Sequence, residues 1–229
     1  MAAPSVAPAR TPVAPISLVV FDLDGTLVDS LRDLTESLNE LLEEYGLRPH
    51  GQDAVGRMVG EGAATLVARG FAAAGREAPA GALARFLELY EGRVLRFTRP
   101  YPGALEMLDL LGRTHRLALL TNKPRLSTMA VLDGLGLAAY FGDSIVGGDE
   151  PIPRKPDPAG LLHLAGRAGV PAASTLLVGD SFVDFRTARS GGAQICMARY
   201  GFGFAEFPVE QLNPSDRLID APLQLLASL

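Results

Sequence analysis

Two acidic residues, Asp22 and Asp24, stand directly after a run of apolar residues near the start of the chain. That run, Ile16 to Phe21, is apolar apart from Ser17, as expected of a strand that is buried on both faces. Two carboxylates at the end of such a strand can turn toward one centre and bind a hard divalent cation. Gly25 follows them, and its freedom to turn tightly would bring backbone N–H groups against an anion. The pattern therefore predicts a site for a metal ion and for an anionic substrate group.

Another acidic pair, Asp180 and Asp184, follows a later apolar run at Thr175 to Val178. Asp180 comes soon after the expected strand, so it is placed to join the metal-binding set. Asp184 falls one turn into the next expected helix, where it would act through a water molecule or pair with Lys155. An acid in the first turn of a helix is also favoured by the helix dipole alone, so this pattern leaves the role of Asp184 open.

Lysine is rare in this chain, because Lys123 and Lys155 are two of 21 basic residues and the remainder are arginines. Pro156 and Pro158 stiffen the backbone after Lys155 and before a helix expected at residues 159–168. The direction of the Lys155 ammonium is thereby restricted, which makes an ordinary solvated lysine a poorer interpretation. Lys123 is expected near the mouth of the site, without a direct role.

Thr121 and Asn122 emerge from the end of a further apolar run at 117–120. Their hydroxyl and amide groups could donate hydrogen bonds to phosphate oxygens. The same two residue types are also common in ordinary turns. They become candidates for substrate binding only because they share the sheet edge with the acidic pairs.

Apolar runs that alternate with helical segments predict the fold. A strand–helix alternation implies a parallel sheet with right-handed crossovers, here an α/β fold with a Rossmann-like core and helices on both faces. The carboxyl ends of parallel strands lie at one edge, where ligands bind in such folds. The expected strands are at 16–21, 117–120, 144–146, 175–178 and 193–197, and the later helices are at 125–135, 159–168 and 182–190.

Roughly 70 residues separate Asp24 from the next pair of expected elements, around Pro102–Leu120, and this is too many for a simple loop. Leucines recur at spacings of three and four after Ser30, and a second such face runs from Leu83 to Phe97. Ser30 and Asp33 are a candidate N-cap pair for the first of these helices. The predicted organisation is a disordered leader at 1–15, an α/β core at 16–28 and 100–229, and an inserted helical cap at 29–99.

Composition excludes several classes of protein. The net charge of −5 argues against a nucleic-acid surface. No apolar stretch approaches the roughly 18 residues of a membrane span. A single cysteine, Cys196, excludes an internal disulfide and favours a reducing compartment. We expect a cytoplasmic monomer or homodimer without nucleic-acid or membrane partners.

Together these motifs resemble those of the haloacid dehalogenase-like hydrolase superfamily from Ile16 onward. The resemblance implies that Asp22 is a nucleophile that forms a phospho-aspartate and that Asp24 is a general acid and base. It implies that Thr121 and Lys155 hold the transferring phosphoryl group. It also implies that Mg²⁺ is bound by Asp22, Asp180 and the backbone carbonyl of Asp24.

Within the insert, the segment from Arg57 to Leu66 is similar to the cap of phosphoglycolate phosphatases. The expected substrate is therefore 2-phosphoglycolate or a close phosphorylated acid, with Arg57 available for its carboxylate, although a solvated helix arginine would look the same. Three alternatives stay open. They are a phosphatase for a sugar phosphate or pyrophosphate, a hexose-phosphate mutase, and a non-catalytic metabolite sensor.

Overall fold

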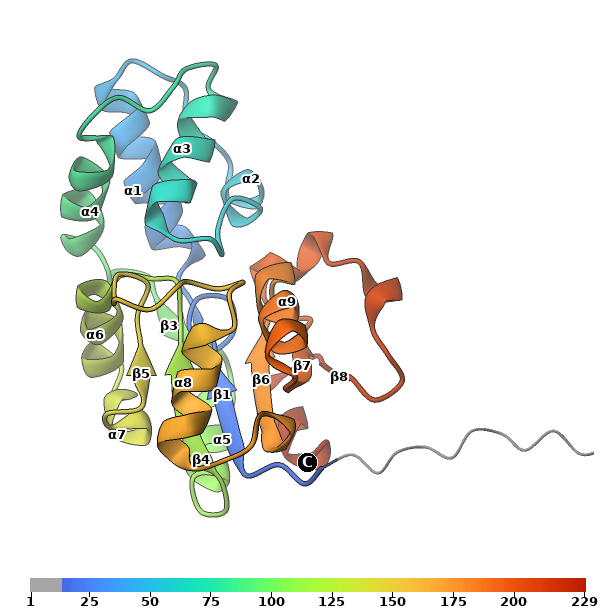
Figure 1. Cartoon of the computed structure of the whole chain (residues 1–229). Coiled ribbons are helices and arrows are strands. Elements are labelled where there is room, and N and C mark those ends of the chain that lie inside the picture. The colour runs from blue at the N-terminus through green and yellow to red at the C-terminus, as the bar shows by residue number, and fades with distance from the viewer. Residues whose placement is uncertain (1–13) are drawn as a thin grey trace, which may run out of the picture.

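The computed structural model describes residues 14–229, and a six-stranded sheet forms its centre (Figure 1). Residues 1–13 of the leader predicted at 1–15 lie outside the described residues. Strand order in the sheet is β5-β4-β1-β6-β7-β8, and each neighbouring pair is parallel. The strands are β1 (Leu18–Phe21), β4 (Arg116–Leu120), β5 (Ile145–Val146), β6 (Thr175–Gly179), β7 (Gln194–Ala198) and β8 (Arg217–Ile219).

Helices cover both faces of this sheet, and β1 shows why. Val19 and Phe21 belong to an apolar cluster with α5, α6 and α7, whereas Leu18 and Val20 belong to a second cluster with α8 and α9. A strand buried on both faces needs the continuously apolar sequence found here. The predicted Rossmann-like α/β fold is therefore confirmed. These helices are α5 (Ala104–Leu111), α6 (Arg125–Gly134), α7 (Ala138–Phe141), α8 (Ala159–Ala168) and α9 (Phe182–Gly191).

The sequence analysis missed three strands. The edge strand β8 has only three residues, of which Ile219 alone is buried, so no apolar run marks it. Strands β2 (Val28–Asp29) and β3 (Arg99–Pro100) form a separate antiparallel pair of two residues each. Short 3-10 helices lie at Ala172–Ser174, Phe202–Glu206, Val209–Gln211 and Pro222–Ala227. No helix within residues 14–229 has the length and apolar character needed to cross a bilayer.

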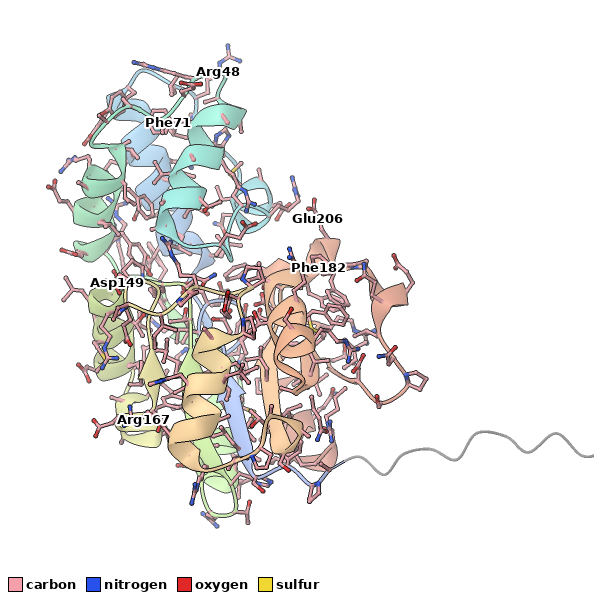
Figure 2. All side chains as sticks on the ribbon, viewed as in Figure 1. Arg48, Phe71, Asp149, Arg167, Phe182 and Glu206 are labelled. Carbon is pink, nitrogen blue, oxygen red and sulfur yellow. The ribbon has the colours of Figure 1, made fainter. Side chains whose placement is uncertain are left out.

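Four helices lie between β2 and β3, beyond the carboxyl ends of the sheet strands (Figure 1). They are α1 (Leu31–Glu44), α2 (Gln52–Gly56), α3 (Ala63–Ala73) and α4 (Ala82–Glu91). They share an apolar interior that includes the fully buried Leu38 and Phe71, and Figure 2 shows Phe71 among these helices. The insert is thus helical, and its division from the core at residues 29 and 99 stays a prediction.

Asp33 joins the two chain segments that connect the insert with the sheet. Its buried carboxylate accepts hydrogen bonds from the Phe97 N–H (3.0 Å), the Thr98 N–H (2.8 Å) and the Thr98 hydroxyl (2.7 Å). The expected capping pair is therefore absent. Ser30 occupies the N-cap position of α1 without a side-chain capping bond. Asp33 instead accepts hydrogen bonds from Phe97 and Thr98, in the segment that leads from the insert back to the sheet.

Replacement of this carboxylate should destabilise the protein. Asp33→Ala leaves three donors without their acceptor, and each unsatisfied buried group costs about 1–3 kcal/mol. We expect a lower free energy of unfolding and a melting temperature reduced by at least about 4 °C. Thermal unfolding monitored by circular dichroism measures the change.

Glu43→Ala is the matched control, because Glu43 is exposed on the same helix. Exposed substitutions of this kind usually change stability by less than about 0.5 kcal/mol. Equal melting temperatures for the two variants would contradict the role given to Asp33.

Candidate active site

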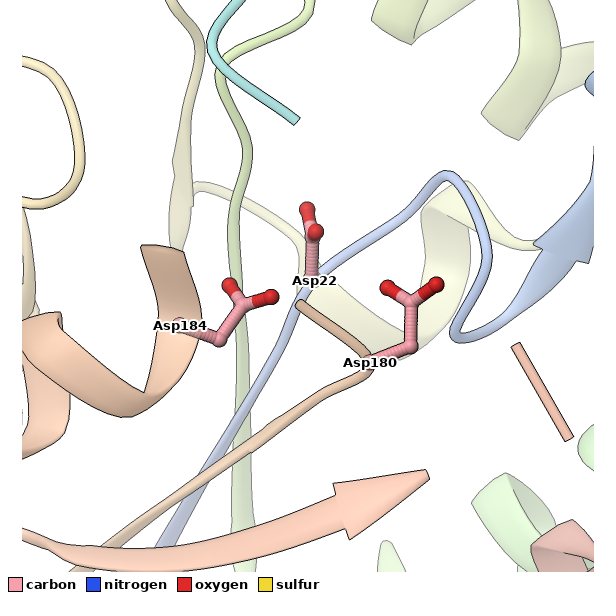
Figure 3. Close-up of side chains that lie close together, drawn as sticks. All are labelled: Asp22, Asp180 and Asp184. Atoms are coloured by element: carbon pink, nitrogen blue, oxygen red, sulfur yellow. The ribbon is translucent and has the colours of Figure 1, made fainter. Parts of the chain in front are cut away.

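Three buried carboxylates converge at the carboxyl edge of the sheet. Asp22 follows β1, Asp180 follows β6, and Asp184 lies in the first turn of α9. Strands β1 and β6 are hydrogen-bonded neighbours with Phe21 opposite Val178, so their ends bring Asp22 and Asp180 close together. One carboxylate oxygen from each of the three acids lies within 4.8 Å of the others, and Figure 3 shows the three side chains close together and extending to the same side.

Gly25 makes room for Asp180. Its φ of +85° favours glycine, and a Cβ at this position would lie 2.1 Å from Asp180 Oδ2. The Gly25 N–H donates to the Val28 carbonyl at 2.9 Å, so it is already used within the turn. The binding of an anion by other backbone N–H groups of this turn stays a prediction. Asp180 itself is held by the Gly203 N–H at 2.7 Å and the Thr26 hydroxyl at 3.3 Å.

Lys155 places its ammonium between two of the acids. Its Nζ lies 2.9 Å from Asp22 Oδ1 and 2.6 Å from Asp184 Oδ1, and only 1% of the side chain is exposed. The other oxygen of Asp184 accepts hydrogen bonds from the Ser181 N–H and hydroxyl in a capping box that begins α9. The expected pairing of Asp184 with Lys155 is therefore present.

The cluster carries more negative than positive charge. Burial raises the pKa of Asp22 to about 7, with Lys155 opposing this shift and Asp184 adding to it. Burial, Asp184 and Asp22 together hold the pKa of Asp180 well above its usual value. Burial would lower the pKa of Lys155, but the two neighbouring carboxylates raise it overall. Carboxylate oxygens that face one another with excess negative charge fit a hard divalent cation.

Thr121 and Asn122 lie where β4 ends, as the sequence suggested, but only one keeps a free donor. The Asn122 amide nitrogen donates to the Gly60 carbonyl at 2.8 Å and to the Lys155 carbonyl at 2.9 Å. Both of its hydrogens are thus used, so the expected amide contact with phosphate is wrong. Asn122 instead ties a loop of the insert to the loop that carries Lys155. The Thr121 hydroxyl accepts from the Lys123 N–H at 3.2 Å and keeps its own hydrogen for another acceptor.

Lys123 is the residue that the sequence analysis missed. Its Nζ lies 2.9 Å and 3.1 Å from the two carboxylate oxygens of Asp24, and 2.6 Å from the Tyr90 hydroxyl on α4. Asp24 also accepts from the Ser30 hydroxyl at 2.6 Å. Lys123 thus contacts a candidate catalytic carboxylate, which the sequence analysis did not expect, and the rarity of lysine in this chain was the available signal.

A cavity lies between the sheet edge and the insert. Its polar wall includes Asp22, Asp24, Thr121 and Lys123, and its apolar wall includes Val59, Leu66 and Phe86 from the insert. Arg57 is not part of this lining. Its side chain is 46% exposed and its Nε lies 3.4 Å from Glu206 Oε1. The structure therefore places Arg57 in a solvent-exposed ion pair, away from the cavity in which it was expected to meet a substrate.

A family model described as haloacid dehalogenase-like hydrolase matches residues 16–192. The chain belongs to that family. Within it, the chain is 48% identical over 193 residues to the phosphoglycolate phosphatase of Rhodospirillum rubrum, a match that covers 80% of each chain. It is 37% identical over 214 residues to the phosphoglycolate phosphatase of Agrobacterium fabrum, covering 91% of this chain and 89% of that one.

Solved structures of the haloacid dehalogenase-like family agree with this assignment. A predicted phosphoglycolate phosphatase from Haemophilus somnus superimposes with a TM-score of 0.85 and 29% identity, and the match covers 94% of this chain and 99% of that one. Phosphatases are thus similar to the chain over most of its length. The chain is a phosphatase of this family, a phosphoric monoester hydrolase.

The charge imbalance of the cluster predicts a pH-dependent stability. The folded pKa of Asp22 is about 7 and that of Asp180 is also raised, whereas unfolded aspartate titrates near about 4. The stability that these groups contribute is therefore fully present below about pH 4 and is lost as the pH rises toward 7. Asp180→Asn should escape part of this loss. In EDTA, its melting temperature minus that of the wild type should increase between about pH 5 and about pH 7.5.

The same pair of proteins tests the metal site. A cation at 100 times its dissociation constant stabilises the folded state by about 2.7 kcal/mol, or roughly 5–10 °C for a chain of this size. Addition of Mg²⁺ should give the wild type an increase of this order and Asp180→Asn a much smaller one. An equal increase in both proteins would remove Asp180 from the metal site.

Proposed function

We propose that this chain is a Mg²⁺-dependent phosphatase that hydrolyses 2-phosphoglycolate through a phospho-aspartate on Asp22. The position of Asp22 is the observation that carries this proposal. Among the described residues, Asp22 alone faces the cavity, contacts the Lys155 ammonium and belongs to the carboxylate cluster. A nucleophile that attacks a phosphate group needs access, nearby positive charge and a fixed direction, and these three contacts supply them.

Asp22 would attack phosphorus with a carboxylate oxygen, forming an acyl phosphate as the ester bond to the leaving oxygen breaks. Its orientation is fixed because Oδ1 accepts from the Leu23 N–H at 2.7 Å and lies 2.9 Å from Lys155. The Lys155 ammonium offsets negative charge on the nucleophile and on the phosphoryl oxygens. The Thr121 hydroxyl, which has a hydrogen to donate, would hold one of those oxygens.

The carboxylates of Asp22 and Asp180 would hold Mg²⁺, with the backbone carbonyl of Asp24 as a third ligand. A bound Mg²⁺ supplies the positive charge that lets an anionic phosphate group approach an anionic nucleophile. Asp184 contributes indirectly by holding Lys155 in place. Division of the displacement into two steps lowers the barrier of each.

Asp24 would transfer the protons. It lines the cavity two residues beyond the nucleophile, and its side chain is 12% exposed. In the first step its carboxyl group would protonate the departing glycolate oxygen. In the second step its carboxylate would remove a proton from the water that attacks the acyl phosphate. One proton is given and one is taken, so Asp24 returns to its starting state.

Similarity to the phosphoglycolate phosphatases of R. rubrum and A. fabrum supports the choice of substrate. Initial rates of phosphate release should be measured with Mg²⁺ for 2-phosphoglycolate, glucose 6-phosphate, glucose 1-phosphate and pyrophosphate. We expect kcat/KM to be highest for 2-phosphoglycolate. A higher kcat/KM for another compound would make that compound the proposed substrate. Isomerisation of a hexose phosphate would indicate a mutase, and no phosphate release from any of the four compounds would favour a sensor.

Asp22→Asn should abolish turnover while the fold is kept, since the two side chains have nearly equal volume. We expect kcat to fall by at least about 10⁴-fold, as for removal of other enzymatic nucleophiles. Rapid acid quench of the wild type with ³²P-labelled substrate should leave label on the protein, and the variant should carry none. Substantial turnover by the variant, freed of contaminating phosphatases, would contradict covalent catalysis by Asp22.

A further inference from the structure

The ammonium of Lys123 occupies an unusual position in the cavity wall. The side chain is only 4% exposed, yet it borders the space in which a leaving group would lie. It is the only cationic residue among the described residues that line this cavity. Asp24 approaches it from the sheet side, and the Tyr90 hydroxyl approaches it from α4 of the insert.

A substrate with an anionic leaving group requires a cation in this wall. When the phosphoryl group lies against Asp22, the rest of the substrate must extend into the cavity, where much of the lining is apolar. An unpaired carboxylate would lose its hydration there at a cost of several kcal/mol. Arg57 cannot offset this cost from its solvent-exposed pair with Glu206.

We propose that Lys123 is the specificity residue that binds the carboxylate of the leaving group; this rests on the proposed hydrolysis of 2-phosphoglycolate. The substrate carboxylate takes up hydrogen bonds that the ammonium now donates to Asp24. Asp24 then keeps its bond from the Ser30 hydroxyl and becomes available to the departing oxygen. Recognition of the leaving group is thereby coupled to placement of the group that protonates it.

Tyr90 makes this recognition depend on the insert. Its hydroxyl lies 2.6 Å from Lys123 Nζ, and the ammonium lies 4.4 Å from the centre of its ring. Both contacts hold the ammonium toward the insert side of the cavity. The carboxylate site is therefore completed by α4, a helix of the insert that is distant in sequence from the catalytic motifs.

A pair of substrates of similar size separates this role from a merely structural one. In 2-hydroxyethyl phosphate, the carboxylate of 2-phosphoglycolate is replaced by an uncharged CH₂OH group. Any damage to Asp24 lowers kcat/KM for both compounds, whereas loss of carboxylate binding lowers it for 2-phosphoglycolate alone. The ratio of the two kcat/KM values is therefore the measurement.

We expect Lys123→Gln to reduce this ratio by about 10- to 100-fold, the effect of one lost charge-assisted hydrogen bond, chiefly through KM for 2-phosphoglycolate. Tyr90→Phe should reduce the ratio by about 5-fold, because the ring remains but the hydrogen bond to the ammonium is lost. Arg57→Gln is the matched control, a cation removed outside the cavity, and should keep the wild-type ratio.

An unchanged ratio in Lys123→Gln overturns the inference, and so does an unchanged ratio in Tyr90→Phe should Lys123→Gln fail to fold. A reduced ratio in Arg57→Gln alone would assign the carboxylate to Arg57 and overturn it as well. These results leave the proposed function standing. A wild-type enzyme that releases phosphate but does not prefer 2-phosphoglycolate over 2-hydroxyethyl phosphate would instead overturn both the substrate and the inference.

Discussion

Three carboxylates and one ammonium are buried together at the carboxyl ends of β1 and β6. The excess of negative charge affects both the stability of the fold and the chemistry of the site. Burial of uncompensated charge opposes folding. The apolar packing of helices against both faces of the sheet stabilises the fold and offsets the cost of this buried charge. A bound divalent cation would relieve the repulsion, so the residues that weaken the fold are the ones that would make it catalytic.

Hydrogen bonds between the sheet edge and the insert extend this constraint to the substrate cavity. Asn122 binds a loop of the insert through the Gly60 carbonyl, and Lys123 binds α4 through the Tyr90 hydroxyl. Asp33 joins the two segments that enter and leave the insert. The position of the insert is therefore coupled to Asp24, the proposed proton donor. A movement of the insert over a bound substrate would therefore also move the groups that act on the leaving oxygen.

Sequence alone predicts the parts of this site that depend on local order. Asp22 and Asp180 follow apolar runs, and the rules of parallel sheets place such strand ends at one edge. The contact between Lys123 and Asp24 spans 99 residues and joins the segments that follow the neighbouring strands β4 and β1, so no local pattern reveals it. Asn122 and Arg57 show the converse: their chemistry suited a substrate, but the fold gave their polar groups other partners. The strand β8 was missed because three residues at a sheet edge leave too weak an apolar pattern.

We propose above all that one cation is shared by carboxylates from two strand ends, with Lys155 beside it. Anomalous diffraction from crystals soaked with Mn²⁺, a close substitute for Mg²⁺ in oxygen-ligand sites, tests it most directly. We expect a single strong peak within coordination distance of Asp22 and Asp180, with the ion pair between Lys155 and Asp184 intact. A peak elsewhere, or a metal ion that displaces Lys155 from Asp184, would contradict it.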